Sequence, residues 1–419
     1  MSRKKQRLRY EVHLDAPELG ACQRVGTLFP HEAMTQLAPA FEYDPSWLES
    51  KNKFMLDPRL DLWRGEQHPP SGASAFGIFM DSAPDRWGRV LMERREALSA
   101  KNAIPPRKIR ALQDFDFLLG VYDETRMGGL RFRLPEGPFL DDSENSVPPV
   151  TRLKELAHVS RLVDGGNENM PEYEKWLAML IAPGSSLGGA RPKANFRDED
   201  GSLWIAKFPA KDDRYDVGAW EYLMHVLGRK AMIELPQARC HKLSNDYTTF
   251  CASRFDRAGA GRRMYASAMT LLERRDGDTG ASYIELAEFI SGNGAQGYID
   301  TDLKQLFRRI VFNVLVGNRD DHLRNHGFIR EPSGWRLSPA FDINPNRSKG
   351  EHAITIDGYD ASPNIQAVMA TAELYRLTKL EAASIKAETI KAIVDWRSDA
   401  ERLGLSSLEI RQMESVIQA

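Results

Sequence analysis

Length, composition and charge limit what this chain can be. Its 419 residues exceed one ordinary hydrophobic core, which favours two domains or one domain with subdivisions. The 42% hydrophobic and 28% charged residues are typical of a folded globular protein. A formal charge of -2 lacks the basic excess of proteins that bind nucleic acids non-specifically, so that role is not supported for the chain as a whole.

Cysteine usage and apolar runs indicate the compartment. Cys22, Cys240 and Cys251 lack metal-ligand spacing and are too few for a disulfide framework, which indicates free thiols in a reducing cytoplasm. The basic start is not followed by the apolar segment of a secretory signal. No run approaches the roughly 18 apolar residues that a membrane-crossing helix needs. We therefore predict a cytoplasmic protein without membrane contact.

The first block, residues 1 to about 135, combines strand and helix signals. Tyr10, Val12 and Leu14 alternate with polar residues, as in a half-buried strand. A helix is predicted from Pro84 through Arg95, after a Ser-Ala-Pro turn. The proline-rich stretch 134–150 has no periodicity and is the predicted linker. We expect an N-terminal α/β subdomain with its linker over residues 1–150.

The pattern changes after this linker. The predicted elements are helices at 151–163 and 171–181, a glycine-rich turn at 183–193, a hairpin turn at Asp200-Gly201, a strand with Lys207, a helix with Glu221, strands at about 237–243 and 247–255, and mostly helix from 265, including an amphipathic helix that ends at Gly317.

This order of elements is that of a protein-kinase small lobe followed by its large lobe. We therefore predict an α+β fold with a two-lobed kinase-like catalytic domain over 151–419. Its small lobe, with a mixed sheet, is expected at about 151–258 and its helical lobe at about 259–419. The smaller N-terminal subdomain precedes it.

The segment GNRDDHLRNHGF, residues 317–328, carries the densest group of functional side chains. Asp320 and Asn325 are five residues apart, which is the separation in a kinase catalytic loop. Phosphoryl transfer needs a carboxylate to accept a hydroxyl proton and nearby oxygens to hold Mg2+. A polar capping loop is the alternative for a single aspartate, but the density favours a catalytic loop.

Three other residues fit the same chemistry. Asp342, in LSPAFDINP, stands where a kinase places its metal-holding aspartate, although an Asx-turn before Asn-Pro is the alternative. Lys207 has apolar neighbours and shares a strand face with Ile205, so it needs an anionic partner such as ATP phosphates; a gatekeeper lysine on an edge strand is the alternative. Glu221 would pair with Lys207 in a kinase-like lobe, although an exposed helical glutamate is the usual explanation.

The glycine-rich turn is a weak motif by spacing alone. Gly184 and Gly189 have Walker A separation, but Ala190-Arg191 stands where Lys-Ser or Lys-Thr is required. Its place before the Lys207 hairpin gives it weight, because its backbone N–H groups, with Lys193, could cradle phosphates. Phosphorylation of Ser185 or Ser186 in this turn would compete with ATP for the same donors.

A metal-hydrolase site is the alternative for the histidines. His322 and His326 are four residues apart, but Leu323 replaces the glutamate of a zincin motif. We therefore expect His322 to be a structural member of the loop or to support the ligand site, and zinc chemistry is the weaker hypothesis.

As a set, these residues resemble the HipA family of serine/threonine kinases, the toxins of HipBA-type toxin–antitoxin modules. The resemblance covers nearly the whole chain. The similar segments are LWRGEQ (62–67), FGIFMDSAPDRWGR (76–89), DETRMGGLRF (123–132), SSLGGARPK (185–193), LWIAKFP (203–209), SRFDR (253–257), GNRDDHLRNHGF (317–328) and PAFDINP (339–345). One departure is GGARPK, where the family often has G-A-Q-x-K.

The resemblance implies roles for these residues. Asp320 is similar to the catalytic aspartate, Asn325 and Asp342 to the Mg2+ ligands, and Ser186 to the loop serine that family members autophosphorylate, with Ser185 beside it. The stretch 251–255 resembles the hinge that holds adenine through its backbone. The implied ATP-binding residues are Ser186, Gly188, Gly189, Lys193, Lys207, Arg254, Phe255 and His322.

The resemblance also implies a function. It implies phosphorylation of a protein serine or threonine with ATP and Mg2+, on a substrate of the aminoacyl-tRNA synthetase class, and growth arrest as the result. The implied partner is a small helix-turn-helix antitoxin that would bring the complex to DNA, since this chain has no helix-turn-helix of its own. The alternatives are a non-catalytic co-repressor that binds such a partner and a kinase acting on a small molecule.

Overall fold

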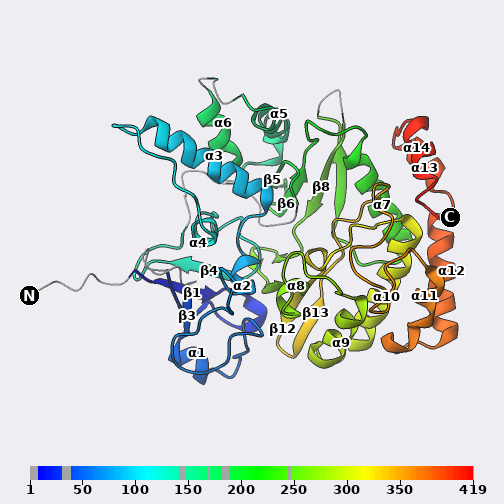
Figure 1. Cartoon of the computed structure of the whole chain (residues 1–419), viewed down its shortest axis with the longest axis horizontal. Coiled ribbons are helices and arrows are strands. Elements are labelled where there is room, and N and C mark those ends of the chain that lie inside the picture. The colour runs from blue at the N-terminus through cyan, green and yellow to red at the C-terminus, as the bar shows by residue number, and fades with distance from the viewer. Residues whose placement is uncertain are drawn as a thin grey trace, which may run out of the picture.

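The computed structural model describes residues 8–30, 39–140, 147–167, 170, 172–181, 189–243 and 247–418. Figure 1 shows the N-terminal sheet at the lower left, the small-lobe sheet in the upper middle and a mainly helical lobe toward the right.

The N-terminal block is built on a four-stranded antiparallel sheet with the order β3-β2-β1-β4. Its strands are β1 (Tyr10–Leu14), β2 (Gln23–Phe29), β3 (Ala40–Tyr43) and β4 (Leu130–Arg133). The strand predicted from Tyr10, Val12 and Leu14 is confirmed. The strand is not half-buried as predicted, because Glu11 and His13 are buried as well as Val12 and Leu14; Val12 lies opposite Phe132 of β4.

Short helices join these strands: η1 (Pro17–Leu19), α1 (Pro45–Glu49), α2 (Gly77–Met80), α3 (Arg86–Asn102) and α4 (Asp114–Leu119). The predicted helix at Pro84 is α3, which begins two residues later because Asp85 caps it: its carboxylate accepts a hydrogen bond from Gly88 N at 2.8 Å. The predicted linker is partly folded, since Leu140 N donates to Phe132 O at 2.8 Å. Residues 141–146 lie outside the described part.

The small lobe follows in the predicted order, with η2 (Val150–Arg152), α5 (Leu153–Asp164), α6 (Tyr173–Ile181), β5 (Lys193–Arg197), β6 (Leu203–Lys207), α7 (Val217–Lys230), β7 (Ala238–His241) and β8 (Thr249–Ser253). Its sheet has the order β5-β6-β8-β7. All pairs between these described strands are antiparallel, which corrects the expectation of a mixed sheet.

The two faces of this sheet have different neighbours. Phe196, Trp204 and Ala206 point to one face and form a hydrophobic cluster with α5 and α6. Ile205 and Phe250 lie on the opposite face, together with Ala252. The alternation of side chains along β6 therefore places Lys207 on the same face as Ile205, as predicted.

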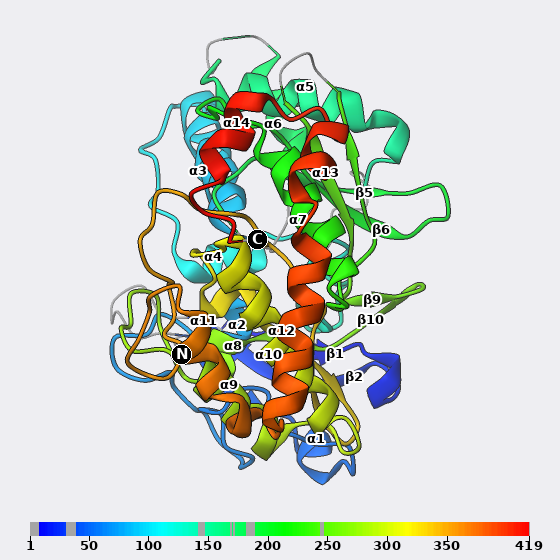
Figure 2. The ribbon, with the colours of Figure 1, turned by 90° about the vertical axis from the view of Figure 1, so that its right-hand side faces the viewer.

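The helical lobe contains β9 (Arg257–Ala258), β10 (Gly261–Arg262), β11 (Tyr265–Ser267), α8 (Ala268–Leu271), α9 (Tyr283–Asn293), α10 (Ile299–Val316), η3 (Leu323–Asn325), β12 (Gly327–Glu331), β13 (Gly334–Leu337), α11 (Ile365–Ala370), η4 (Ala372–Tyr375), α12 (Lys379–Ile393), α13 (Trp396–Arg402) and α14 (Ser407–Met413). In Figure 2 the long α12 runs beside α10, and these two helices are in contact.

The predicted amphipathic helix is α10, and it is more buried than an amphipathic pattern requires. Every residue from Leu306 to Val316 is buried, including Arg308 and Arg309. The helix ends at Gly317, whose φ of 68° lies in the left-handed region. A Cβ atom on Gly317 would lie 2.2 Å from the Val416 side chain. Glycine is therefore required here for conformation and for space.

A continuous hydrophobic cluster connects the N-terminal block to the helical lobe, from Val12 to Ile417. The fold is α+β, with a small sheet lobe, a helical lobe and an N-terminal block that packs on the rest. The domain boundary at residue 150 stays a prediction. Among the described helices, none combines the length and the hydropathy needed to span a membrane.

Candidate active site

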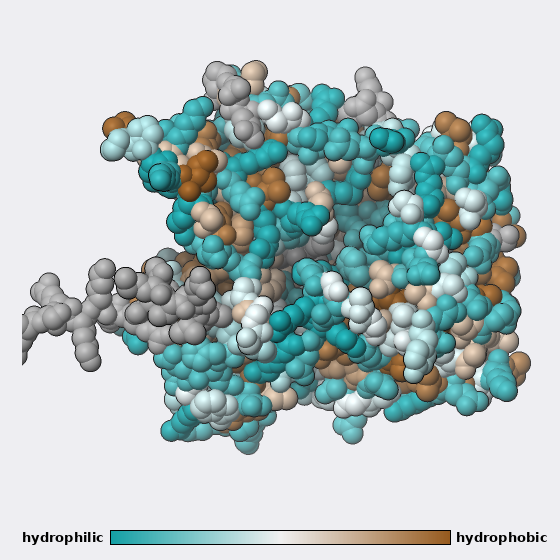
Figure 3. All heavy atoms as spheres, in the orientation of Figure 1, coloured by the Kyte–Doolittle hydropathy of each residue, from teal (hydrophilic) through white to brown (hydrophobic). Residues whose placement is uncertain are grey.

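A cavity of about 650 Å³ opens between the small sheet and the segment after β13. In Figure 3 the mostly hydrophilic surface is hollowed near the middle of the molecule. The cavity walls are largely apolar, and one end carries three charged side chains. The lining residues are Ile205, Lys207, Glu221, His225, Leu235, Pro236, Phe250, Ala252, Ser253, Phe255, Ala340, Phe341, Asp342 and Ile343. Its largely apolar walls, with a few polar groups at one end, are those of a small-molecule site.

The charged end is organised by Lys207. Its Nζ donates to Glu221 Oε1 at 2.5 Å and to Asp342 Oδ1 at 2.7 Å. Burial alone would lower the pKa of Lys207, but the carboxylates of Asp342 and Glu221 raise it well above its usual range. Lys207 is thus held as a cation, and the ion pair expected between Lys207 and Glu221 is present.

The two carboxylates differ in their electrostatics. Burial raises the pKa of Glu221, and the charge of Lys207 offsets this only in part. For Asp342 burial acts in the same direction, but the charge of Lys207 outweighs it and lowers the pKa to about 2. Asp342 also has a φ of 58°, which is rare for a residue other than glycine and is often found at functional sites. Asp342 is therefore an ionised carboxylate that faces the cavity.

The position of Glu221 depends on the start of α7. Asp216 caps this helix by accepting from Ala219 N at 3.0 Å, and it also accepts from Thr248 N at 2.9 Å and from Thr248 Oγ1 at 2.7 Å. Gly218 allows a close approach, since a Cβ there would lie 2.0 Å from Thr248 O. These contacts hold α7 against β8 and direct Glu221 toward Lys207.

The predicted catalytic loop follows α10. Asp320 lies at the surface with its side chain 53% exposed, and it forms an ion pair with Lys349. Asn325 is buried, and its Nδ2 donates to Asp320 O at 3.3 Å. This hydrogen bond holds the two ends of the Asp320–Asn325 segment together. It uses the amide nitrogen of Asn325, so the amide oxygen Oδ1 can serve as a metal ligand.

Asp321 holds the loop in place through contacts on its buried side. Its buried Oδ2 accepts hydrogen bonds from Tyr283 OH at 2.6 Å and Asn313 Nδ2 at 2.7 Å, and it contacts His326 Nε2 at 2.9 Å. Burial would raise the pKa of Asp321, but His326 and these hydrogen bonds lower it. His326 therefore has a structural partner. Among the described residues, no group of three or more His, Cys, Asp or Glu side chains is arranged to hold a metal.

The predicted hinge lies along one wall of the cavity. Ser253 and Phe255 line it, and the Phe255 ring stacks on Phe341 with 5.3 Å between centroids. The Arg254 side chain is not part of the lining. It is buried and donates to both carboxylate oxygens of Asp256, at 2.7 and 2.6 Å. The prediction that Arg254 binds ATP therefore has no support from its side chain.

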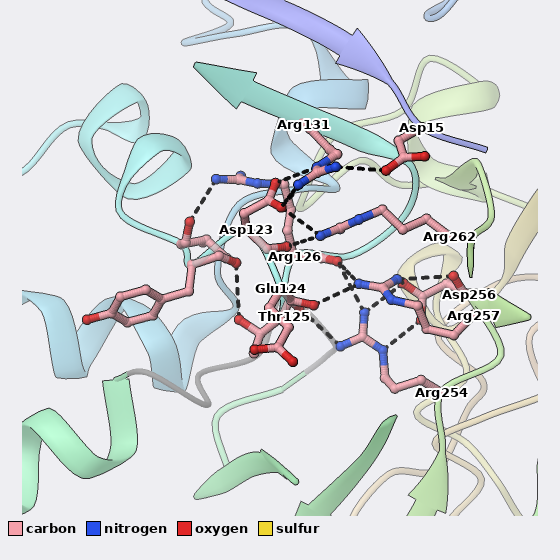
Figure 4. A network of polar contacts seen from close by, with 12 residues as sticks. Asp15, Asp123, Glu124, Thr125, Arg126, Arg131, Arg254, Asp256, Arg257 and Arg262 are labelled. Atoms are coloured by element: carbon pink, nitrogen blue, oxygen red, sulfur yellow. Dashed lines mark hydrogen bonds and ion pairs between the residues drawn. The ribbon is translucent and has the colours of Figure 1, made fainter. Parts of the chain in front are cut away.

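Arg254 instead belongs to a network that joins the hinge to residues 123–128 of the N-terminal block (Figure 4). Asp256 accepts from Gly128 N at 2.8 Å, and Arg257 donates to Arg126 O at 2.7 Å. Arg262 contacts Asp123 at 3.0 Å. The hinge is thus fastened to the N-terminal block by buried arginines that contact two carboxylates and several backbone carbonyls.

With this geometry in place, comparisons with known proteins place the chain in a family. A sequence model described as the HipA-like C-terminal domain matches residues 185–398, half of the chain, and this range contains Lys207, Glu221, Asp320 and Asp342. The chain belongs to the HipA family. No curated protein matches it.

Solved structures agree with the HipA fold. HipA of Shewanella oneidensis MR-1, solved with HipB and its operator DNA, has a TM-score of 0.66 and 18% sequence identity, over 97% of this chain and 94% of that chain. At this identity the likeness shows the fold. The Helicobacter pylori proinflammatory kinase CtkA covers 51% of this chain and 95% of its own, at 12% identity and a TM-score of 0.34, from which we infer nothing.

The glycine-rich turn of this HipA-family chain is described only at its end. Ser185, Ser186 and Gly188 lie outside the described residues. Gly189 has a φ of 90°, and Lys193 is 1% exposed. Lys193 therefore lies inside the protein, directly opposite Lys207 in the register of β5 and β6.

His322 is a half-buried residue of the predicted catalytic loop, and its Nδ1 has no hydrogen-bond partner among the described residues. It does not line the cavity.

The sequence analysis did not identify Asp216 and Asp321. A signal existed for Asp321, because a second acidic residue follows Asp320 directly after the apolar α10.

Proposed function

We propose that this chain is an ATP-dependent serine/threonine protein kinase of the HipA type and the toxin of a toxin–antitoxin module. One observation carries the proposal: Lys207 is held between Glu221 and Asp342 at the charged end of an apolar cavity. A lysine of this kind binds nucleotide phosphates in protein kinases when its glutamate partner and the metal-holding aspartate are both in place. The family membership supports the same reading.

The chemistry of two predicted residues suits Mg2+. Mg2+ prefers hard oxygen ligands, and the Asp342 carboxylate and the Asn325 side-chain oxygen are such ligands; Asp342 lines the cavity, whereas Asn325 does not. When bound, Mg2+ would neutralise charge on the ATP phosphates. Asp342 already lies next to the ammonium of Lys207, so a phosphate group near both would find a cation and a metal ligand together. We therefore assign Asn325 and Asp342 to the metal and Lys207 to the phosphates.

The transfer step requires a proton acceptor. The substrate hydroxyl oxygen forms a bond to the γ-phosphorus while the bond to the β–γ bridging oxygen breaks and ADP leaves, and Asp320 takes the hydroxyl proton. Asp320 is exposed, as a residue that meets a protein substrate must be. Its surface ion pair with Lys349 is worth little, so a substrate hydroxyl can displace Lys349.

Substrate and partner follow from the family resemblance. We propose a protein of translation, of the aminoacyl-tRNA synthetase class, as the substrate, and autophosphorylation at Ser186 or Ser185. The similar Shewanella HipA was solved with HipB and operator DNA. We therefore propose a small helix-turn-helix antitoxin as the partner of this chain, with DNA reached through that partner.

The test is incubation of the purified protein with Mg2+ and γ-labelled ATP, with the label mapped by mass spectrometry. Asp320→Asn should abolish labelling. Asp300→Asn is the matched control, because Asp300 is also an exposed aspartate in an ion pair, with Arg376. Label on Ser186 or Ser185 in wild type and control alone supports the proposal. ATP binding without label directs the search to an external protein or a small molecule. Absence of both label and ATP binding would leave the co-repressor role.

A further inference from the structure

Lys193 and Lys207 face each other on neighbouring strands, and Lys207 lines the charged end of the cavity. Lys193 of β5 lies directly opposite Lys207 of β6 in the antiparallel register, so both side chains are on the same face of the sheet. Directly opposed residues have Cβ atoms about 4.5–5.5 Å apart, and like charges in this arrangement repel. Each ammonium therefore needs its own carboxylate.

The carboxylate that serves Lys193 comes from the N-terminal block. Lys193 Nζ contacts Asp85 Oδ2 at 2.5 Å, and it donates to Gly189 O at 3.0 Å. The two side chains are 1% and 5% exposed. Lys207 has Glu221 and Asp342 for the same purpose. Lys193 is thus a second buried lysine beside Lys207, and its carboxylate partner, Asp85, lies 108 residues away in the sequence.

Asp85 is itself held in place. Its Oδ1 accepts from Gly88 N at 2.8 Å and caps α3, while its Oδ2 faces Lys193. One carboxylate therefore ties the start of a 17-residue helix to the strand that leads out of the glycine-rich turn. The hinge end of the cavity is joined to the same block through Asp256 and Gly128.

We propose that Asp85 is a positioning residue for nucleotide phosphates: it holds Lys193 beside Lys207 as a second phosphate-binding cation, so the N-terminal block completes the nucleotide site. This inference rests on the proposed kinase function. Without Asp85, Lys193 would be a buried ammonium next to another ammonium, and its lowest-energy response is to move away from Lys207. The phosphates would then lose one of two cations.

The experiment compares full-length wild type with Asp85→Asn, because asparagine can still cap α3 while it removes the charge. Asp85→Ser, which also caps, is the second variant. Asp57→Asn is the matched control, since Asp57 is a buried carboxylate in the same block that accepts from Ile78 N at 3.0 Å and Arg59 N at 2.9 Å. Binding of ATP, ADP and adenosine is measured by calorimetry, and KM for ATP and kcat are measured with labelled ATP.

We expect both Asp85 variants to bind ATP and ADP about tenfold or more weakly, with adenosine within twofold of wild type, and to raise KM for ATP more than they lower kcat. The Asp57→Asn control should bind all three ligands as wild type does. Equal weakening of adenosine binding would overturn the inference, because it indicates general damage. Unchanged or tighter ATP binding would overturn it as well. If the wild type itself binds no ATP, the proposed function and this inference both fail. That result is distinguishable from wild-type binding that the Asp85 variants leave unchanged, which overturns this inference alone.

Discussion

Asp320 and Asp321 are neighbours in the sequence and have opposite environments. The Asp320 side chain is 53% exposed and pairs with Lys349, whereas that of Asp321 is 5% exposed and is surrounded by three polar groups. Adjacent residues after the end of α10 thus point to solvent and to the interior. In the proposed function Asp320 acts on the substrate, while Asp321 holds the shape of the loop.

Asparagine substitutions should separate these two roles. Asp320→Asn is expected to abolish phosphoryl transfer and to change the free energy of unfolding by less than about 0.5 kcal/mol, because the site is exposed. Asp321→Asn should lower the free energy of unfolding by about 3 kcal/mol, because an NH2 group would face buried donors. Urea unfolding and the labelling assay measure both. Equal destabilisation by the two variants would contradict this assignment.

Glu221→Gln tests the charged end of the cavity. The variant keeps the shape of the side chain but leaves Lys207 with Asp342 as its carboxylate partner, so we expect kcat/KM to fall by about tenfold or more. Asp399→Asn is the control, because Asp399 pairs with Lys230 at the other end of α7. It should reduce stability without a comparable loss of kcat/KM. Full activity in Glu221→Gln would show that the Lys207–Glu221 pair is not needed for transfer.

Asp256 should make stability depend on pH. Burial would raise its pKa, but the charges of Arg254 and Arg257 hold it well below the ordinary 3.8. The stability that Asp256 contributes is therefore fully present above about pH 4 and is lost as the pH falls below it. Asp256→Asn should lower the free energy of unfolding by about 3–5 kcal/mol at neutral pH and flatten its decline in acid. Urea titrations between about pH 3 and pH 6 provide the measurement.

Two glycines of α7 should respond differently to alanine. A Cβ on Gly218 would lie 2.0 Å from the backbone oxygen of Thr248, so α7 must move away from β8 and Glu221 must move with it. We expect about a tenfold loss of kcat/KM in Gly218→Ala. In Gly228→Ala the nearest atom is Leu235 Cδ1 at 2.9 Å, the end of a flexible side chain that lines the cavity, so kcat/KM should fall less than in Gly218→Ala. Kinase assays and thermal unfolding of both variants test this.

Local patterns predicted much of the fold because the signals lie within one element. Alternation along β6 placed Lys207 on the correct face, and the apolar pattern of α10 with Gly317 gave the helix before the catalytic loop. The spacing of Asp320 and Asn325 survives in three dimensions because a hydrogen bond joins the two residues.

Long-range pairings could not be predicted in this way. Asp85 and Lys193 lie 108 residues apart, and neither position carries a local sign of the other. Arg254 was expected to bind ATP because the family resemblance places it within the hinge stretch 251–255. Its neighbour Asp256, two residues later, was the available signal that this arginine has a buried internal partner.

Residues 416 and 418 pack against the end of α10, where the predicted catalytic loop begins. Val416 packs against Gly317, and Gln418 N donates to Leu315 O at 2.7 Å. Residues 416 and 418 therefore support the end of α10, the helix that leads to Asp320. A substitution that loosens the packing of Val416 on Gly317 would reach the segment that carries Asp320 from a distant part of the sequence, so its effect on labelling would report on that segment as well.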